Sequence, residues 1–282
     1  MTAEGARHTV ELAAELARFR AAHPPVRRVV DGVCWEYVVG GQGATTLVLL
    51  PGGPGRAETS FQYILALEED YRVIAPSYPA AITRADALVD GLRAILAYED
   101  ACPAHVAGGS YSGLVAQHLV RRHPTAIASL ALSDTGVPCR GRVKYLRVLR
   151  WLLARLPAPV VRTLLRLGTR AYVAETGRQS AFWHGYFHDL IGTLERADWL
   201  SRLDVWIDLD RQGASGTWPG RILLLHVDHD PLFGAADRAA LLARFPRAWV
   251  VALGGGRHAA SLGRAHAYIA AMRAFVDEQE QI

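Results

Sequence analysis

The chain has 282 residues and 51% of them are hydrophobic, which is enough for one large domain with a sizeable buried core. Its apolar runs fall short of the roughly 18 residues that a membrane-spanning helix needs, so we expect no such helix. The formal charge is +4, but Lys144 is the only lysine and no nucleic-acid-binding motif accompanies the arginines, so we expect no nucleic-acid partner.

The first twenty or so residues predict a short amphipathic helix. Charged residues interrupt its apolar positions, which argues against a secretory signal. The three cysteines, Cys34, Cys102 and Cys139, are odd in number and far apart, a pattern that favours neither a disulfide framework nor a zinc site. We therefore predict a cytoplasmic protein.

The next segments alternate between strands and helices. Residues 29–39 predict an antiparallel edge strand or hairpin, with a turn at residues 40–43. Short aliphatic runs then predict buried parallel strands at 46–50, 72–75, 105–107, 129–132, 222–226 and 249–253. Helical patterns lie between them near 57–68, 86–99, 111–123, 236–244 and 260–277. This alternation predicts the α/β class, with a mostly parallel central sheet flanked by helices.

The strand at 105–107 leads into a turn that carries a candidate nucleophile. The sequence runs His-Val-Ala-Gly-Gly-Ser-Tyr-Ser-Gly from His105 to Gly113 and is followed by a helix, the context of a nucleophile elbow. So sharp a turn needs small residues two positions before and after the nucleophile. Gly108 and Ser112 meet this requirement around Ser110, whereas Leu114 would break it around Ser112. We therefore predict Ser110 as the nucleophile.

Residues 136–218 interrupt the alternation, because they contain helical patterns and no convincing strand. We interpret them as a helical cap inserted into a core formed by residues 1–135 and 219–282. Such a cap would cover the carboxyl edge of the sheet, where ligands bind in open α/β sheets. Within it His184 and His188 have the spacing of zinc ligands, but no third ligand is obvious. We interpret them as cap residues that line a pocket and predict no metal site.

The first part of the cap is basic. Between Thr135 and Ala174 the chain has nine basic residues and no acid: Arg140, Arg142, Lys144, Arg147, Arg150, Arg155, Arg162, Arg166 and Arg170. Helical spacing predicts a basic face directed outward and an apolar face directed at a pocket. The apolar residues are Tyr145, Leu146, Val148, Leu149, Leu152, Leu164 and Leu165. The simplest interpretation is a solvated arginine face. The alternative is a face that meets an anionic handle, such as a carrier-bound substrate, coenzyme A or an acidic membrane surface.

A serine nucleophile requires a base and an acid that orients it. His258 follows the last predicted strand in Gly-Gly-Gly-Arg-His, and Asp230 follows the preceding strand. The 28 residues from Asp230 to His258 leave room for one helix and one strand. Two other acids remain candidates, since Asp228 lies near the same strand end and Asp134 ends the strand before the cap.

Together these motifs resemble the α/β-hydrolase superfamily, and the order Ser110, Asp230, His258 is the order of its catalytic residues. The loop Pro51-Gly-Gly-Pro-Gly also resembles that of proline iminopeptidases, but Pro51 stands where they have histidine, which argues against a peptidase. Residues 19–20, 61–67 and 71–79 resemble the maspardin branch, which implies a fold rather than a substrate.

The resemblance implies a serine hydrolase that cleaves an ester, thioester or lactone through an acyl-enzyme, without a cofactor. It further implies an oxyanion hole formed by the backbone N–H groups of Tyr111 and of Gly53, since Pro51 and Pro54 have no N–H to donate. An acyltransferase or cyclase, or a non-catalytic binding scaffold with this fold, are the alternatives. The sequence does not indicate an oligomeric state.

Overall fold

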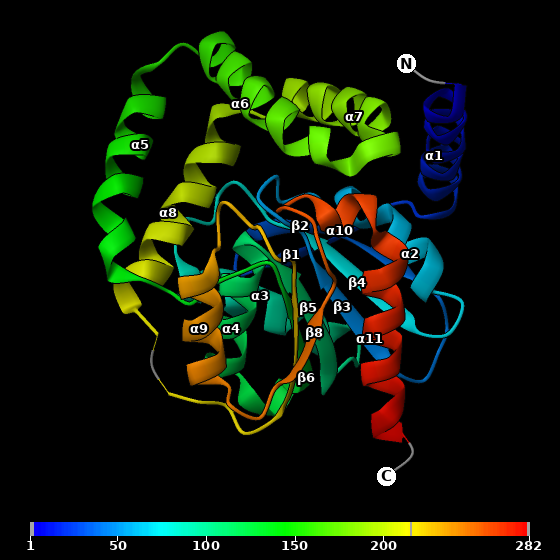
Figure 1. Cartoon of the computed structure of the whole chain (residues 1–282). Helices are drawn as coiled ribbons and strands as arrows, with labels where there is room; N and C mark the ends of the chain where they lie inside the picture. The colour runs from blue at the N-terminus through cyan, green and yellow to red at the C-terminus, as the bar shows by residue number, and fades with distance from the viewer. Residues whose placement is uncertain (1–2, 215, 281–282) are drawn as a thin grey trace.

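Eight strands form one sheet in the computed structural model, which describes residues 3–214 and 216–280. The order across the sheet is β1-β2-β4-β3-β5-β6-β7-β8, and the strands from β3 to β8 run parallel (Figure 1). Their bounds are Val26–Val30 (β1), Val33–Gly40 (β2), Thr46–Leu50 (β3), Arg72–Ser77 (β4), Ala104–Gly109 (β5), Ile127–Ser133 (β6), Arg221–His226 (β7) and Trp249–Ala252 (β8). The prediction of a mostly parallel α/β sheet is confirmed.

The antiparallel part of the sheet is a hairpin at one edge. Strand β1 pairs antiparallel with β2, and β2 pairs antiparallel with β4. The hairpin turns at Asp31 and Gly32, whose φ angles are 48° and 77°. Two consecutive positive φ angles are typical of the two-residue turns that match the twist of a hairpin. The turn that we predicted at residues 40–43 is instead the connection from β2 to β3, and the Asp-Gly pair was the better signal.

Helices cover both faces of the sheet because its central strands are apolar on both sides. Leu47 and Leu49 pack toward α2 and α11, whereas Val48 and Leu50 pack toward α3 and α4. This alternation along one strand produces two cores, one on each face. The helices outside the cap segment are α1 (Ala3–Ala22), α2 (Phe61–Leu67), α3 (Ala85–Tyr98), α4 (Tyr111–Arg122), α9 (Ala235–Arg244), α10 (Ala260–Gly263) and α11 (Ala265–Glu280).

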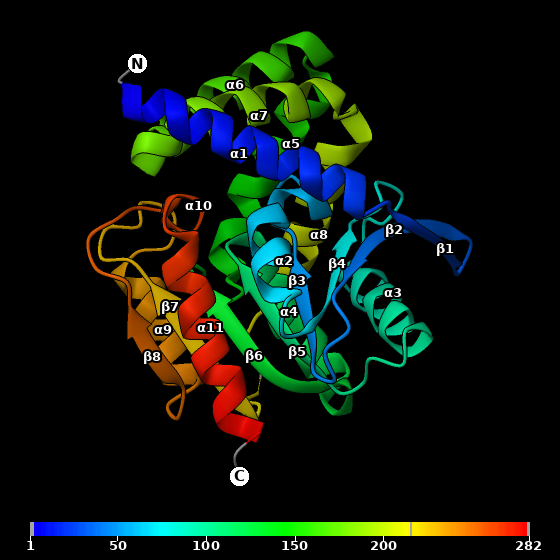
Figure 2. The same cartoon turned by 90° about the vertical axis from the view of Figure 1, so that its right-hand side faces the viewer.

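The segment between β6 and β7 has four α-helices, and its described residues include no strand. They are α5 (Val143–Arg155), α6 (Ala158–Val173), α7 (Ser180–Thr193) and α8 (Arg196–Gln212). Figure 1 shows α6 and α7 above the sheet, with α5 and α8 at its side. Figure 2 shows the N-terminal helix α1 running along α7, where Leu16 and Phe19 share a core with Phe182 and Trp183. The division at residues 136 and 218 stays a prediction.

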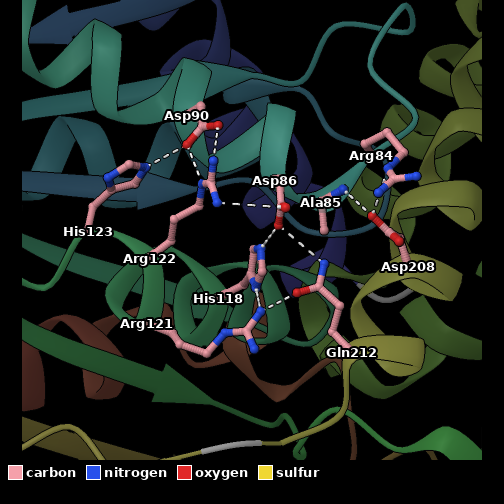
Figure 3. Close-up of polar contacts among 10 residues, drawn as sticks. All are labelled: Arg84, Ala85, Asp86, Asp90, His118, Arg121, Arg122, His123, Asp208 and Gln212. Atoms are coloured by element: carbon pink, nitrogen blue, oxygen red, sulfur yellow. Dashed lines mark hydrogen bonds and ion pairs between the residues drawn. The ribbon is translucent and has the colours of Figure 1, made fainter.

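Polar contacts attach α8 to the helices of the sheet (Figure 3). The Gln212 amide donates to Asp86, and Asp86 accepts a second hydrogen bond from His118 at 2.7 Å. Arg121 donates to the other ring nitrogen of His118, so the ring is neutral, and burial lowers the pKa of His118 in agreement. Asp208 accepts the backbone N–H of Ala85 at the first turn of α3. The last helix of the cap segment is therefore fixed to α3 and α4.

The predicted orientation of α5 is wrong. Tyr145, Val148 and Leu149 are 79%, 60% and 43% exposed, although we expected them to face a pocket. Only Leu146 and Leu153 of this helix are buried, in a cluster that includes residues of α8. The physical reason is that α5 packs beside α8 and not over the carboxyl edge of the sheet, which α6 and α7 cover (Figure 1).

Candidate active site

The turn between β5 and α4 holds Ser110 in a strained conformation. Its φ and ψ angles are 52° and −124°, a region that a residue with a side chain rarely adopts. Small neighbours make this turn possible, since a Cβ on Gly108 would lie 2.6 Å from the carbonyl oxygen of Ser112. The Thr135 hydroxyl donates to the Ser110 carbonyl oxygen at 2.7 Å and fixes the turn to the strand end of β6. The Ser110 side chain consequently lies in the cavity above the sheet.

Three predicted residues from separate loops meet at this turn. His258 Nε2 lies 2.8 Å from Ser110 Oγ, and His258 Nδ1 lies 2.7 Å from Asp230 Oδ2. The side chains of His258 and Asp230 are 6% and 2% exposed. A carboxylate can only accept, so the Nδ1 proton is donated to Asp230, and Nε2 is left to accept the Ser110 hydroxyl proton. The arrangement can transfer a proton from the serine to the imidazole.

The Asp230 carboxylate is held in its charged form. Its Oδ1 atom accepts the backbone N–H groups of Leu232 and Phe233 at 2.8 and 3.0 Å. Burial raises the pKa of Asp230, but the hydrogen bond and charge of His258 and the two N–H groups outweigh burial, so the net pKa is lowered. The negative charge is therefore available to orient the imidazole and to stabilise it when it is protonated.

Among the described residues, the alternative acids do not form a hydrogen bond with His258. Asp134 is buried, and its carboxyl accepts hydrogen bonds from the Val227 backbone N–H at 3.2 Å and from the Tyr268 hydroxyl. Burial raises its pKa to about 6, despite these hydrogen bonds and the nearby His258. Asp228 is exposed. Across residues 3–214 and 216–280, His258 forms its carboxylate hydrogen bond with Asp230 and with neither alternative.

The second serine of the turn has a different environment. Ser112 is fully buried, and its hydroxyl donates to the carbonyl oxygens of Gly109 and Leu50 at 2.9 and 3.1 Å. These contacts join the first turn of α4 to the ends of β5 and β3. Ser112 is therefore suited to support the turn, whereas Ser110 is the serine beside the imidazole.

The backbone N–H groups of Tyr111 and Gly53 are the oxyanion donors that we predicted, and this role stays a prediction. Tyr111 is the first residue of α4, where backbone N–H groups have no partner within the helix. Gly53 lines the cavity in the loop after β3, and apart from its own atoms and those of its chain neighbours, no heavy atom of the described residues lies within 4 Å of the position that its Cβ would occupy. The loop is held by a turn in which the Gly55 N–H donates to the Gly52 carbonyl oxygen at 2.9 Å.

A mainly apolar cavity of about 380 Å³ opens beside Ser110. Its walls come from the sheet, from α2 and α11, and from α6 and α7 of the cap segment. The aromatic members are Tyr63, Tyr172, Phe187 and Tyr268. The Tyr172 and His258 ring centroids lie 5.8 Å apart, so α6 covers one side of the imidazole. Sequence analysis missed these aromatic residues, because no local pattern indicates which helix faces will meet over the sheet.

The histidine pair of α7 does not line this cavity. His184 and His188 are both exposed, so our interpretation of them as pocket residues is wrong. Their neighbours Phe187 and Trp183 are buried instead and form the inner side of the helix. Over the part of the chain that the structure describes, no group of three or more histidine, cysteine or acidic side chains could hold a metal ion. The same part includes no helix long and apolar enough to cross a membrane.

Comparisons with known proteins agree with this architecture. The sequence model of the alpha/beta hydrolase family matches residues 47–271, which span the chain from β3 to β8 and include all three candidate catalytic loops. No curated protein matches the chain significantly.

Solved structures with the same fold are similar over nearly the whole chain. An enol-lactonase from Burkholderia xenovorans LB400 is 17% identical, with a TM-score of 0.75 over 89% of this chain and 100% of that one. A thermophilic esterase from Thermogutta terrifontis is 14% identical, with a TM-score of 0.76 over 90% and 98%. A hydrolase from Pseudomonas aeruginosa PA01 is 16% identical, with a TM-score of 0.74 over 89% and 98%. At these identities the likeness shows the fold alone.

Proposed function

Because the chain belongs to the alpha/beta hydrolase family, we propose that it is a serine hydrolase that cleaves an ester, thioester or lactone. The observation that carries the proposal is the hydrogen-bond chain from Asp230 through His258 to Ser110, placed at a strained turn beside an apolar cavity. An unreactive serine needs neither a strained backbone nor an imidazole within 2.8 Å of its hydroxyl.

In the proposed mechanism His258 Nε2 takes the proton from Ser110 Oγ while that oxygen attacks the substrate carbonyl carbon. Asp230 stabilises the imidazolium that forms. The N–H groups of Gly53 and Tyr111 bind the oxyanion, and losing one such donor typically costs about 2.7–4 kcal/mol of transition-state stabilisation. His258 then protonates the leaving group. Water, activated by the same imidazole, attacks the acyl-enzyme and releases Ser110 and the carboxylic acid product.

The cavity supports a substrate with an apolar acyl group. Leu49, Phe187, Leu262 and Met272 are among its walls, and they would exclude water from such a group. Two of the similar structures are named as an enol-lactonase and an esterase, and both names describe cleavage of an oxygen ester. We therefore favour an ester or lactone. A carrier-bound thioester and a maspardin-like branch stay predictions.

The proposed compartment is the cytoplasm. Cys34, Cys102 and Cys139 are free and exposed, and thiols in this state persist under reducing conditions.

Acyl transfer to another acceptor is the second candidate function, since the same acyl-enzyme would serve it. The contact of Tyr172 of α6 with the His258 ring favours acyl transfer, because a covered imidazole admits water less readily. The ratio of acid to transferred product, measured with an added alcohol acceptor, separates hydrolysis from transfer.

Labelling with a fluorophosphonate, followed by turnover of p-nitrophenyl esters of increasing chain length, tests the proposal. We expect labelling and turnover in the natural chain and neither in Ser110→Ala. Ser112→Ala is the matched control, since it removes a hydroxyl from the same turn and should still be labelled. If Ser110→Ala is labelled and remains active, Ser110 is not the nucleophile. If the natural chain is neither labelled nor active, the binding-scaffold alternative is favoured.

A further inference from the structure

The exposed sides of α5 and of α6 are both unusually apolar for a surface. Fifteen large hydrophobic side chains are exposed across the described residues, and eight of them belong to these two consecutive helices. We call this set the α5–α6 face: Tyr145, Val148, Leu149, Trp151 and Leu152 of α5, and Val160, Leu164 and Leu167 of α6, which are between 42% and 79% exposed. Concentrated exposed apolar surface of this kind marks interaction sites.

Basic side chains accompany the α5–α6 face. Of the nine cations in this segment, five are held within the cap segment. The carboxylates of Asp210 and Asp204 hold Arg142 and Arg150, and backbone carbonyl oxygens of Arg211, Leu194 and His188 hold Arg140, Arg162 and Arg166. Lys144, Arg147 and Arg155 of α5 are exposed, and no described carboxylate lies within ion-pair distance of them. The Arg155 guanidinium lies 4.0 Å from the Trp151 ring centroid. The face is therefore both apolar and cationic.

We propose that the α5–α6 face docks the chain onto the surface of an anionic lipid bilayer. Tyrosine and tryptophan are the side chains that settle at the boundary between headgroups and acyl chains, and lysine and arginine extend from apolar surface to lipid phosphates. A second copy of this chain is a poorer occupant, because a twofold contact through this face would bring Lys144, Arg147 and Arg155 against the same cations of the partner.

Helix α6 connects this face to the candidate active site. Gly168, Thr169 and Tyr172 line the cavity beside Ser110, whereas Leu164 and Leu167 of the same helix are exposed. Docking would therefore place lipid against the helix that covers the cavity. The inference extends beyond the proposed hydrolase activity and does not depend on it, since the face includes no residue of the hydrogen-bond chain.

Sedimentation of the full chain with lipid vesicles tests the proposal. The probes are vesicles of phosphatidylcholine alone and of phosphatidylcholine with phosphatidylglycerol, each at low and high salt. We expect binding to the anionic vesicles at low salt, and weaker binding at high salt, which screens surface charge. The Ser110→Ala chain should bind equally well, so that failure of docking and failure of the hydrolase proposal are distinguishable.

Two sets of substitutions separate the contributions of charge and apolar surface. The charge variant Lys144→Gln/Arg147→Gln/Arg155→Gln should lose roughly fivefold in partition for each cation, on the order of 100-fold in total. The apolar variant Val148→Ser/Trp151→Ser should lose at least about tenfold, because the side chains that enter the lipid are removed.

The matched control is Arg27→Gln/Val29→Ser, which changes an exposed cation and an exposed apolar residue on β1, far from α5 (Figure 2). It should bind as the natural chain does, and equal thermal unfolding midpoints would show that all variants are folded. The proposal is overturned if the natural chain binds neither kind of vesicle, or if binding is the same in both variants and the control. It is also overturned if light scattering shows a dimer that depends on this face while vesicle binding is absent.

Discussion

The buried carboxyl of Asp134 should make the stability of the fold depend on pH. It lies 7% exposed at the end of β6, with hydrogen bonds from the Val227 N–H and the Tyr268 hydroxyl. Burial raises its pKa from the ordinary value of 3.8 to about 6. Replacing Asp134 with asparagine keeps the shape and removes the ionisation. The amide can still accept from the Val227 N–H and donate to the Tyr268 oxygen.

The sign follows from proton binding in the two states. Between pH 3.8 and about 6 the native chain keeps the Asp134 proton while the unfolded chain has lost it. The contribution to stability is therefore fully present below pH 3.8 and is lost as pH rises through about 6. The difference between the two pKa values corresponds to about 3 kcal/mol of unfolding free energy. Asp134→Asn should consequently be more stable than the natural chain near pH 8, by up to this amount.

Urea unfolding followed by circular dichroism, at about pH 4.5 and about pH 8, measures the effect. Other titrating groups cancel when the natural chain and Asp134→Asn are compared at each pH. The unfolding free energy of Asp134→Asn should exceed that of the natural chain by a larger amount at high pH than at low pH. The esterase activity of the variant should stay close to that of the natural chain. An equal gap at both pH values would refute the reasoning from burial. A loss of activity by orders of magnitude would instead identify Asp134 as the acid.

Three further changes test the site and the cap segment. Asp230→Asn should lower kcat by about 10⁴-fold in ester turnover, because the amide favours the wrong imidazole tautomer; a small effect would exclude Asp230 as the acid. Gly108→Ala should abolish fluorophosphonate labelling, because its Cβ would lie 2.6 Å from the Ser112 carbonyl oxygen and displace the turn; retained labelling would show that the turn can adjust. Arg142→Met should destabilise the chain by about 3–5 kcal/mol in urea unfolding, because the fully buried Asp210 carboxylate would lose its cationic partner and keep only the Cys139 N–H; an unchanged midpoint would contradict this.

The strands were predictable because the central part of the sheet is buried on both faces. The run at 46–50 coincides with β3, and the other parallel strands differ from their predicted ranges only by residues at the ends. An uninterrupted aliphatic run identifies such strands without reference to their neighbours. The hairpin was less well located, because β1 and β2 are partly exposed and their mixed residues mark no end. The turn chemistry of Asp31 and Gly32 was the local signal that could have placed it.

The candidate site was predictable only where neighbouring residues or the order of the strands determine its geometry. Small residues around Ser110 are a local requirement, and parallel strands bring the loops that carry Asp230 and His258 to the same edge of the sheet. The structure places these three side chains in contact, and their catalytic roles stay a proposal. The contact of Asp134 with Tyr268 depends on how α11 packs against the sheet, which no spacing along the chain indicates.

The orientation of α5 also could not be predicted from the sequence. Helical spacing separates its cations from its apolar residues, but it does not indicate which side will meet a neighbouring helix. Packing against α8 buries Leu146 and Leu153 and leaves Tyr145 and Trp151 in solvent. Removing these aromatic side chains from water would be favourable, and nothing within the described chain does so. An anionic bilayer would both bury them and neutralise the cations beside them, which a purely apolar or purely basic partner would not. The combination of exposed apolar and basic side chains on the α5–α6 face therefore indicates the kind of partner. Helical spacing in the sequence indicated only that α5 has an apolar side.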